Sequence, residues 1–218
     1  MSFSPRRGDV GVEPQAVLNE GELRELLGYP SGRAVTKERT KLHDIDRQWL
    51  AASPFCVLAT SDAQGRCDAS PKGDPAGSLF HVLDDATIAI AERPGNRRAD
   101  GYMNVLSNPH VGIISLIPGR QDTLRINGRA RLLRDAAFFD EMIVRGKRPI
   151  LALVVEVEQI FFHCSKAFMR SELWQPETWT PETMPSRSVM TKTLQDTPET
   201  LAELDEYYDP VNYAKGLY

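Results

Sequence analysis

Residues 88–99, Ile88-Ala-Ile-Ala-Glu-Arg-Pro-Gly-Asn-Arg-Arg-Ala99, join an apolar run to a helical pattern through a tight basic turn. The apolar run is typical of a buried strand, and the Pro-Gly pair marks the turn. Asn96 can cap the following helix, and Asn108-Pro109 can end it. The apolar stripe of this helix consists of Ala99, Tyr102, Met103 and Leu106. The stretch predicts a crossover helix between two β-hairpins.

Six further runs around this stretch are typical of β-strands. Together with the strand before the basic turn, Thr87 to Ala91, they give seven predicted strands. In chain order these are Phe55 to Ser61, Gly65 to Ser70, Leu79 to Leu83, Thr87 to Ala91, His110 to Ile117, Thr123 to Leu133 and Leu151 to Phe162. Asp62 to Gly65 and Asp84-Asp85 are short, hairpin-type connections. Seven closely spaced strands that pair with sequence neighbours predict an antiparallel barrel or sandwich.

Helical patterns flank the β section. Asn19 can cap a short helix that ends at Gly28, and a second helix is expected from about Thr36 to Ala52. Before them, residues 1–18 predict a loosely ordered arm. Beyond Trp174 the composition turns to Pro, Thr, Glu and Ser, which predicts an extended segment before a last helix around Pro198 to Tyr208. We therefore expect one domain in three parts: residues 1–52, 53–170 and 171–218.

Composition excludes several classes of function. The net charge of -4 and a pI near 5.6 argue against binding to nucleic acid, which needs a clustered Lys/Arg excess. No stretch approaches the ~20 apolar residues that span a bilayer, and no secretory signal is readable, so we expect a soluble, cytoplasmic protein. The irregular spacing of Cys56, Cys67 and Cys164 favours free thiols over disulfides.

The basic turn is a candidate phosphate site. If the helix begins at Asn96, then Arg97 and Arg98 lie in its first turn, where free backbone N–H groups and the helix dipole favour an anion. Arginines there oppose the dipole, and a bound anion would relieve them. The alternative is a basic turn that is simply solvated.

Three other segments offer cationic or polar side chains. Alternation in residues 123–133 places Thr123 and Arg125 on one strand face, which could line an anionic groove or be solvated surface. The other members of that face are Asn127, Arg129 and Arg131, and solvation is favoured for the last two. Ser70 and Lys72, at a strand end, could contact phosphate. Lys166 and Arg170, followed by Trp174, form a set suited to a planar anionic ring; Phe168 and Trp174 could equally pack at a dimer interface.

Other chemistries are poorly supported by the sequence. The four histidines are scattered, and neighbouring His163 and Cys164 would face opposite sides of a strand, so we expect no metal site. The chain has no nucleophile elbow, dinucleotide fingerprint, Walker loop or paired helical histidines. No catalytic acid, base or nucleophile can be assigned.

Taken in order, the blocks Ser70-Pro-Lys-Gly73, Glu92 to Arg98, Thr123 to Ala130 and Cys164 to Trp174 resemble the pyridoxamine 5'-phosphate oxidase-like FMN-binding split-barrel family. They are especially similar to a bacterial branch of flavoproteins related to that oxidase. The resemblance implies a mainly β fold with α: an antiparallel, Greek-key-like split barrel with N-terminal helices and a crossover helix. It further implies a homodimer with FMN in a groove between the subunits. The family's phosphate-binding positions correspond to Lys72, Asn96, Arg97, Arg98 and Thr123.

The resemblance also limits the function. The Trp- and Arg-rich motif that true pyridoxamine-phosphate oxidases carry near the C-terminus is not recognisable after residue 170, so vitamin B6 is not the expected substrate. The leading hypothesis is an FMN-dependent oxidoreductase acting on a small molecule, with Arg125, Lys166 and Arg170 near the flavin ring or an anionic substrate. The alternative is a non-catalytic protein that stores or senses flavin or haem.

Overall fold

The computed structural model describes residues 15–218, and the chain divides into two units, residues 1–37 and 38–218. The first unit contains helix α1 (Glu20–Leu27) and the single-turn α2 (Gly32–Val35). Asn19 caps α1 as predicted, because its side-chain oxygen accepts from the Glu22 N–H at 3.0 Å. Neither helix buries a residue. Most of the arm expected over residues 1–18 lies outside the described residues.

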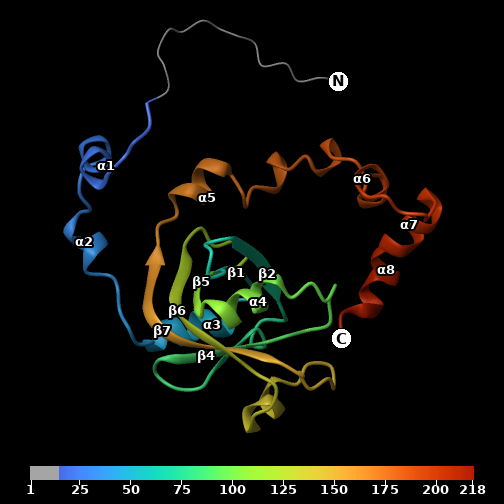
Figure 1. The fold of residues 1–218 in the computed structure, drawn as a ribbon, viewed down its shortest axis with the longest axis horizontal. Coiled ribbons are helices and arrows are strands. Elements are labelled where there is room, and N and C mark those ends of the chain that lie inside the picture. The colour runs from blue at the N-terminus through green and yellow to red at the C-terminus, as the bar shows by residue number, and fades with distance from the viewer. Residues whose placement is uncertain (1–14) are drawn as a thin grey trace, which may run out of the picture. The chain divides into compact units, whose positions relative to one another are not determined.

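The second unit is built on one antiparallel sheet of seven strands (Figure 1). Their order is β2-β1-β5-β6-β7-β4-β3, so β2 and β3 are the edge strands. The bounds are β1 (Phe55–Ser61), β2 (Cys67–Gly73), β3 (Phe80–Val82), β4 (Thr87–Ala91), β5 (His110–Leu116), β6 (Thr123–Leu133) and β7 (Ala152–His163). All seven predicted strands are therefore confirmed, each to within three residues at either end. This mainly antiparallel sheet with helices is the split-barrel class that the sequence predicted.

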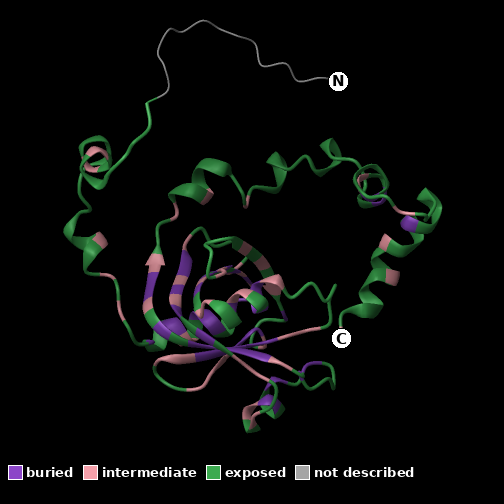
Figure 2. Cartoon of the chain, viewed as in Figure 1, coloured by how far each residue is buried: buried purple, intermediate pink, exposed green. Residues whose placement is uncertain are grey.

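The main core lies on one face of the curled sheet, and a smaller buried cluster around Phe139 lies on the opposite face of β4 and β7. Figure 2 shows buried and exposed residues along the strands. Helix α3 (Asp44–Ala52) closes part of it with Trp49 and Leu50, and the Trp49 indole N–H donates to Ser115 Oγ of β5 at 3.1 Å. At Gly128 the β6–β7 register shifts, and an added Cβ would lie 2.1 Å from the backbone oxygen of Glu156. Only glycine fits at that close approach.

The helix expected from Thr36 to Ala52 was predicted too long, because α3 begins only at Asp44. The backbone of Arg39 instead exchanges two hydrogen bonds with Ile160 of β7, at 3.1 and 2.7 Å. His43 then caps α3 in a capping box with Asp46, whose buried carboxylate also forms a bidentate pair with Arg39. Pairing with a distant strand has overridden the local helical pattern.

The crossover helix also begins later than predicted. Helix α4 (Asp100–Ser107) is preceded by Ala99 in the left-handed region, with φ of 56°, and Asn96 is not its cap. Arg97 is left-handed as well, with φ of 61°. The expected arginines of the first turn therefore lie in the loop before it, and the first turn carries Asp100 instead. An acidic residue there matches the helix dipole, so the predicted conflict between cations and dipole is absent.

Short helices follow the sheet: α5 (Lys166–Ser171), α6 (Arg187–Leu194), α7 (Leu201–Tyr208) and α8 (Pro210–Tyr213). The last predicted helix corresponds to α7, whereas α6 was not predicted and is capped by Ser186. Single 3-10 turns are η2 (Pro176–Thr178), η3 (Pro181–Thr183) and η4 (Ala214–Gly216), and η1 (Ala137–Met142) lies between β6 and β7. Within residues 15–218, no helix has the length and apolar character needed to cross a bilayer.

Candidate functional site

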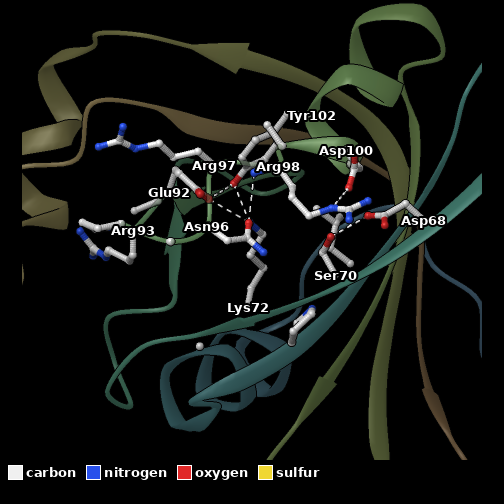
Figure 3. A pocket seen from close by; sticks show the side chains of 18 of the residues that line it. Asp68, Ser70, Lys72, Glu92, Arg93, Asn96, Arg97, Arg98, Asp100 and Tyr102 are labelled. Atoms are coloured by element: carbon white, nitrogen blue, oxygen red, sulfur yellow. Dashed lines mark hydrogen bonds and ion pairs between the residues drawn. The ribbon is translucent and has the colours of Figure 1, made fainter. Parts of the chain in front are cut away.

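A cavity of about 460 Å³ lies between edge strand β2 and the loop that connects β4 to α4 (Figure 3). β2 is one edge of the sheet, and β4 lies next to the other edge strand, β3. The cavity therefore lies between the two ends of the strand order, at the split of the barrel. Five of the residues that the sequence singled out line it: Ser70, Lys72, Asn96, Arg97 and Arg98. The fold thus brings together a strand end and a turn that are about 25 residues apart in sequence.

Lys72 is the centre of a compact polar cluster in the cavity. Its ammonium donates to Glu92 Oε2 at 2.8 Å and to the Tyr102 hydroxyl at 2.9 Å, and it lies 4.5 Å from the centroid of the Tyr102 ring. The Tyr102 hydroxyl in turn donates to the Glu92 carboxylate. Burial, together with this carboxylate, raises the pKa of Tyr102 and keeps the phenol protonated. The cluster links β2, the end of β4 and α4 across the split.

Cys56 of β1 is paired in register with Lys72 and is fully buried. Burial raises the pKa of its thiol to about 12, and the nearby positive charge of Lys72 opposes this only in part. At neutral pH the thiol is therefore protonated, and Cys56 does not supply a nucleophile to the cavity.

Arg98 is held by neighbours within its own loop. Its Nε donates to Asp100 Oδ2 at 2.7 Å, and this bond raises the pKa of the guanidinium. Its backbone N–H donates to the Asn96 side-chain oxygen at 3.1 Å. Asp68 of β2 lies nearby and accepts from the Ser70 hydroxyl at 2.6 Å. An anion that binds Arg98 must therefore share it with acidic groups.

The guanidinium of Arg97 differs from that of Arg98 in its partners. Within residues 15–218 its guanidinium has neither an ion pair nor a hydrogen bond. Figure 3 shows its side chain pointing to the opposite side of the loop from Arg98. The two arginines do not form a converging clamp in this structure, although both line the cavity. Arg97 is thus a cation with its full charge available to a ligand.

Arg93 also lines the cavity, but its charge is already used. Its guanidinium donates to Asp74 Oδ2 at 2.7 Å and to the Met142 carbonyl at 2.9 Å, and the Asp74 side chain is almost fully buried. The Tyr218 hydroxyl donates to the other oxygen of Asp74 at 2.7 Å. This second cluster fastens the end of the described chain beside the cavity.

The remaining predicted site residues are not among the cavity residues. Thr123 is buried in β6 opposite His163, and Arg125, two residues on, lies 5.1 Å from the Phe161 ring centroid. Lys166 and Arg170 belong to α5, beyond the end of the sheet. A separate hollow of about 350 Å³ lies near the β5–β6 turn, lined by Ile45, Gln48, Trp49, Ile117, Arg120, Asp122 and Phe162.

Sequence reasoning missed the acidic half of the cavity. Asp68 shares a strand face with Ser70 and Lys72 by period-2 alternation, so that signal was present in the sequence. Glu92 follows β4 directly, and Tyr102 was assigned only to an apolar helix stripe. Among residues 15–218, no group of three or more His, Cys, Asp or Glu side chains is arranged to hold a metal ion.

Comparison with known proteins identifies the family. Residues 42–164, more than half of the chain, match the family model described as pyridoxamine 5'-phosphate oxidase. The chain belongs to this family. The matched segment runs from just before α3 to the residue after β7, so it contains the whole sheet and the cavity. No curated protein sequence matches the chain.

Several solved structures are similar to part of the chain at low identity. HupZ from Group A Streptococcus is 20% identical, with 56% of this chain and 93% of that chain covered and a TM-score of 0.45. A Lactobacillus delbrueckii protein proposed to be a pyridoxamine 5'-phosphate oxidase is also 20% identical, with 58% and 99% covered and a TM-score of 0.45. The heme storage protein HutZ from Vibrio cholerae is 18% identical, with 56% and 94% covered and a TM-score of 0.40.

Proposed function

We propose that this member of the oxidase family binds FMN in the cavity at the split and acts as an FMN-dependent oxidoreductase on a small molecule. The observation that carries the proposal is the guanidinium of Arg97, which is unpaired within residues 15–218, in a cavity that also presents Asn96, Arg98, Ser70 and Lys72. Charged and neutral hydrogen-bond donors gathered from two segments suit the phosphate of a phosphomonoester.

The cavity is compatible with a ligand of this class. Its volume of about 460 Å³ falls within the range of small-molecule sites, which is roughly 300–1,000 Å³. Arg97 would bind the phosphate without losing a partner from the described part of the chain, and the Asn96 amide adds neutral donors. Arg98 and Lys72 would contribute after sharing or exchanging their present partners, Asp100 and Glu92.

The flavin would supply the redox chemistry, since its ring accepts or donates hydride at N5. The protein's own residues would bind and orient it. The Tyr102 hydroxyl stays protonated and the Cys56 thiol stays neutral, so neither provides a base at neutral pH. We assign no general acid, base or nucleophile to this chain.

We further propose a symmetric homodimer with FMN at the subunit interface. Arg125, Lys166 and Arg170 do not line the cavity of their own chain. In a two-fold dimer the same residues of the partner subunit would complete the walls around the flavin ring, and isologous pairing would give two equivalent sites. Light scattering at micromolar concentration should report a dimer; a stable monomer that retains FMN would contradict this arrangement.

An absorbance spectrum with cofactor extraction and mass identification tests the cofactor directly. We expect a yellow protein that releases FMN. Reduction by NADH or NADPH, with reoxidation faster than that of free FMN, would support an enzyme. Flavin that is bound but kinetically inert would favour storage or sensing, and extraction of haem would replace the flavin proposal. A colourless protein that does not bind added FMN would refute it.

A further inference from the structure

Acidic side chains in the cavity nearly balance its cations. Four cationic residues line it: Lys72, Arg93, Arg97 and Arg98. Three carboxylates line it as well: Asp68, Glu92 and Asp100. A site evolved only to attract anions has no need of these carboxylates, because each of them repels a phosphate group. Their positions therefore bear on how tightly the cavity holds an anion.

We propose that Glu92 limits the affinity of the cavity for phosphate, because it competes with the ligand's phosphate for the ammonium of Lys72. The inference rests on the proposed FMN site and concerns how tightly that site holds the phosphate. It predicts that removing the charge of Glu92 strengthens the binding of a phosphate-bearing ligand and leaves a ligand without phosphate unaffected.

The geometry of the Lys72 ammonium supports this role. The group has three N–H donors, and two of them are directed to Glu92 and Tyr102, at 2.8 and 2.9 Å. An incoming phosphate must bind the remaining donor or displace Glu92. The Tyr102 hydroxyl donates to the same Glu92 oxygen and holds the carboxylate in place. Glu92 therefore stays in the cavity as a fixed negative charge.

Exposure determines how strongly the charge acts. The side chains of Lys72 and Glu92 are 18% and 31% exposed, so both remain accessible to a ligand while water screens them only partly. For a carboxylate ~5 Å from a phosphate oxygen in such a setting, removing the carboxylate charge should change affinity on the order of tenfold.

Glu92→Gln tests the proposal, because glutamine keeps an acceptor for Lys72 and Tyr102 but removes the charge. Isothermal titration should show FMN affinity rising about tenfold and riboflavin affinity unchanged, since riboflavin has no phosphate. Glu158→Gln is the matched control: it removes the same charge from an exposed residue of β7 that does not line the cavity. Glu92→Asp, which withdraws the carboxylate from Lys72, should give an intermediate gain and serves if the glutamine variant does not fold.

The double variant Lys72→Met with Glu92→Gln shows whether Glu92 acts through Lys72. The gain from Glu92→Gln should shrink when the ammonium is absent, and an equal gain in both backgrounds would overturn competition. The proposal also fails if folded Glu92→Gln binds FMN no more tightly than wild type, or if riboflavin gains equally.

A flavin-free measurement separates this test from the proposed function. If wild type binds no flavin, the FMN proposal fails, and inorganic phosphate then decides the role of Glu92. The thermal transition of the Glu92→Gln variant should rise more with added phosphate than that of wild type. An equal rise in both proteins would overturn the inference.

Discussion

Separate removal of Arg97 and Arg98 should have unequal effects on FMN binding. The guanidinium of Arg97 has no other partner in the described part of the chain, so its full interaction with phosphate is lost in Arg97→Ala. A charge-assisted hydrogen bond is worth about 1.5–3 kcal/mol, which corresponds to a loss of roughly 10- to 150-fold in affinity. Arg98 already bonds Asp100 at 2.7 Å and must exchange that partner. Arg98→Ala should therefore cost less.

The assay is isothermal titration of FMN into wild type, the two single variants and the double variant, with circular dichroism to show that each is folded. Riboflavin is the ligand control, because it lacks the phosphate and its weaker binding should scarcely change. Asp100→Asn is the protein control. It releases Arg98 from its acidic neighbour and should increase FMN affinity.

Three results would refute this reasoning. Equal losses for FMN and riboflavin would place the arginines at the flavin ring or in the scaffold. A larger loss for Arg98→Ala than for Arg97→Ala would mean that the loop rearranges on binding and that the free guanidinium is not the principal phosphate ligand. A folded double variant with unchanged FMN affinity would remove the phosphate from this loop altogether.

Further predictions concern thiols and packing. Iodoacetamide at pH 8 should label exposed Cys67 and Cys164 in the native protein but not buried Cys56, and peptide mass mapping can show which thiols are labelled. Replacing all three cysteines by Ser or Ala should leave FMN binding largely intact. The folded pKa of Cys56, about 12, lies above its unfolded value, so its contribution to stability is full below about pH 8.5 and is lost as pH rises toward 12. Urea midpoints should consequently fall at alkaline pH, and less steeply in Cys56→Ala; an identical slope would contradict the assignment. Gly128→Ala should destabilise the protein by at least about 2 kcal/mol in urea unfolding, because the new Cβ meets the Glu156 backbone oxygen at 2.1 Å. Near-wild-type stability would show that the backbone at this register shift moves to make room.

Local patterns were sufficient to predict the sheet. Strands such as Phe55–Ser61 and Thr87–Ala91 were predicted residue for residue, because apolar runs between turn residues have few alternatives. The start of α3 could not be predicted in the same way. Its apparent N-terminal extension contains Arg39, whose backbone pairs with Ile160 far along the chain, and no local signal reports such a contact.

The candidate site was predictable in its cations but not in their partners. Lys72 and Arg98 could be selected from residue type and position near a turn. Glu92 meets Lys72 only because the end of β4 folds against β2, and Asp100 meets Arg98 at the start of the crossover helix, where the N-cap is the left-handed Ala99, three residues after Asn96. Sequence rules place helix ends only within a few residues, and here that margin decides which charges face one another.

The position of β7 in the strand order has a consequence for biosynthesis. β7 lies between β6 and β4, so the β3–β4 hairpin has no bonded neighbour in the sheet until the β7 segment has been translated. Until residues 152–163 have emerged from the ribosome, the β2-β1-β5-β6 sheet and the β3–β4 hairpin each have an unpaired edge. Such edges are the surfaces most prone to intermolecular pairing. Nascent chains stalled before this point should depend on chaperones, whereas chains stalled well beyond it should already resist proteolysis.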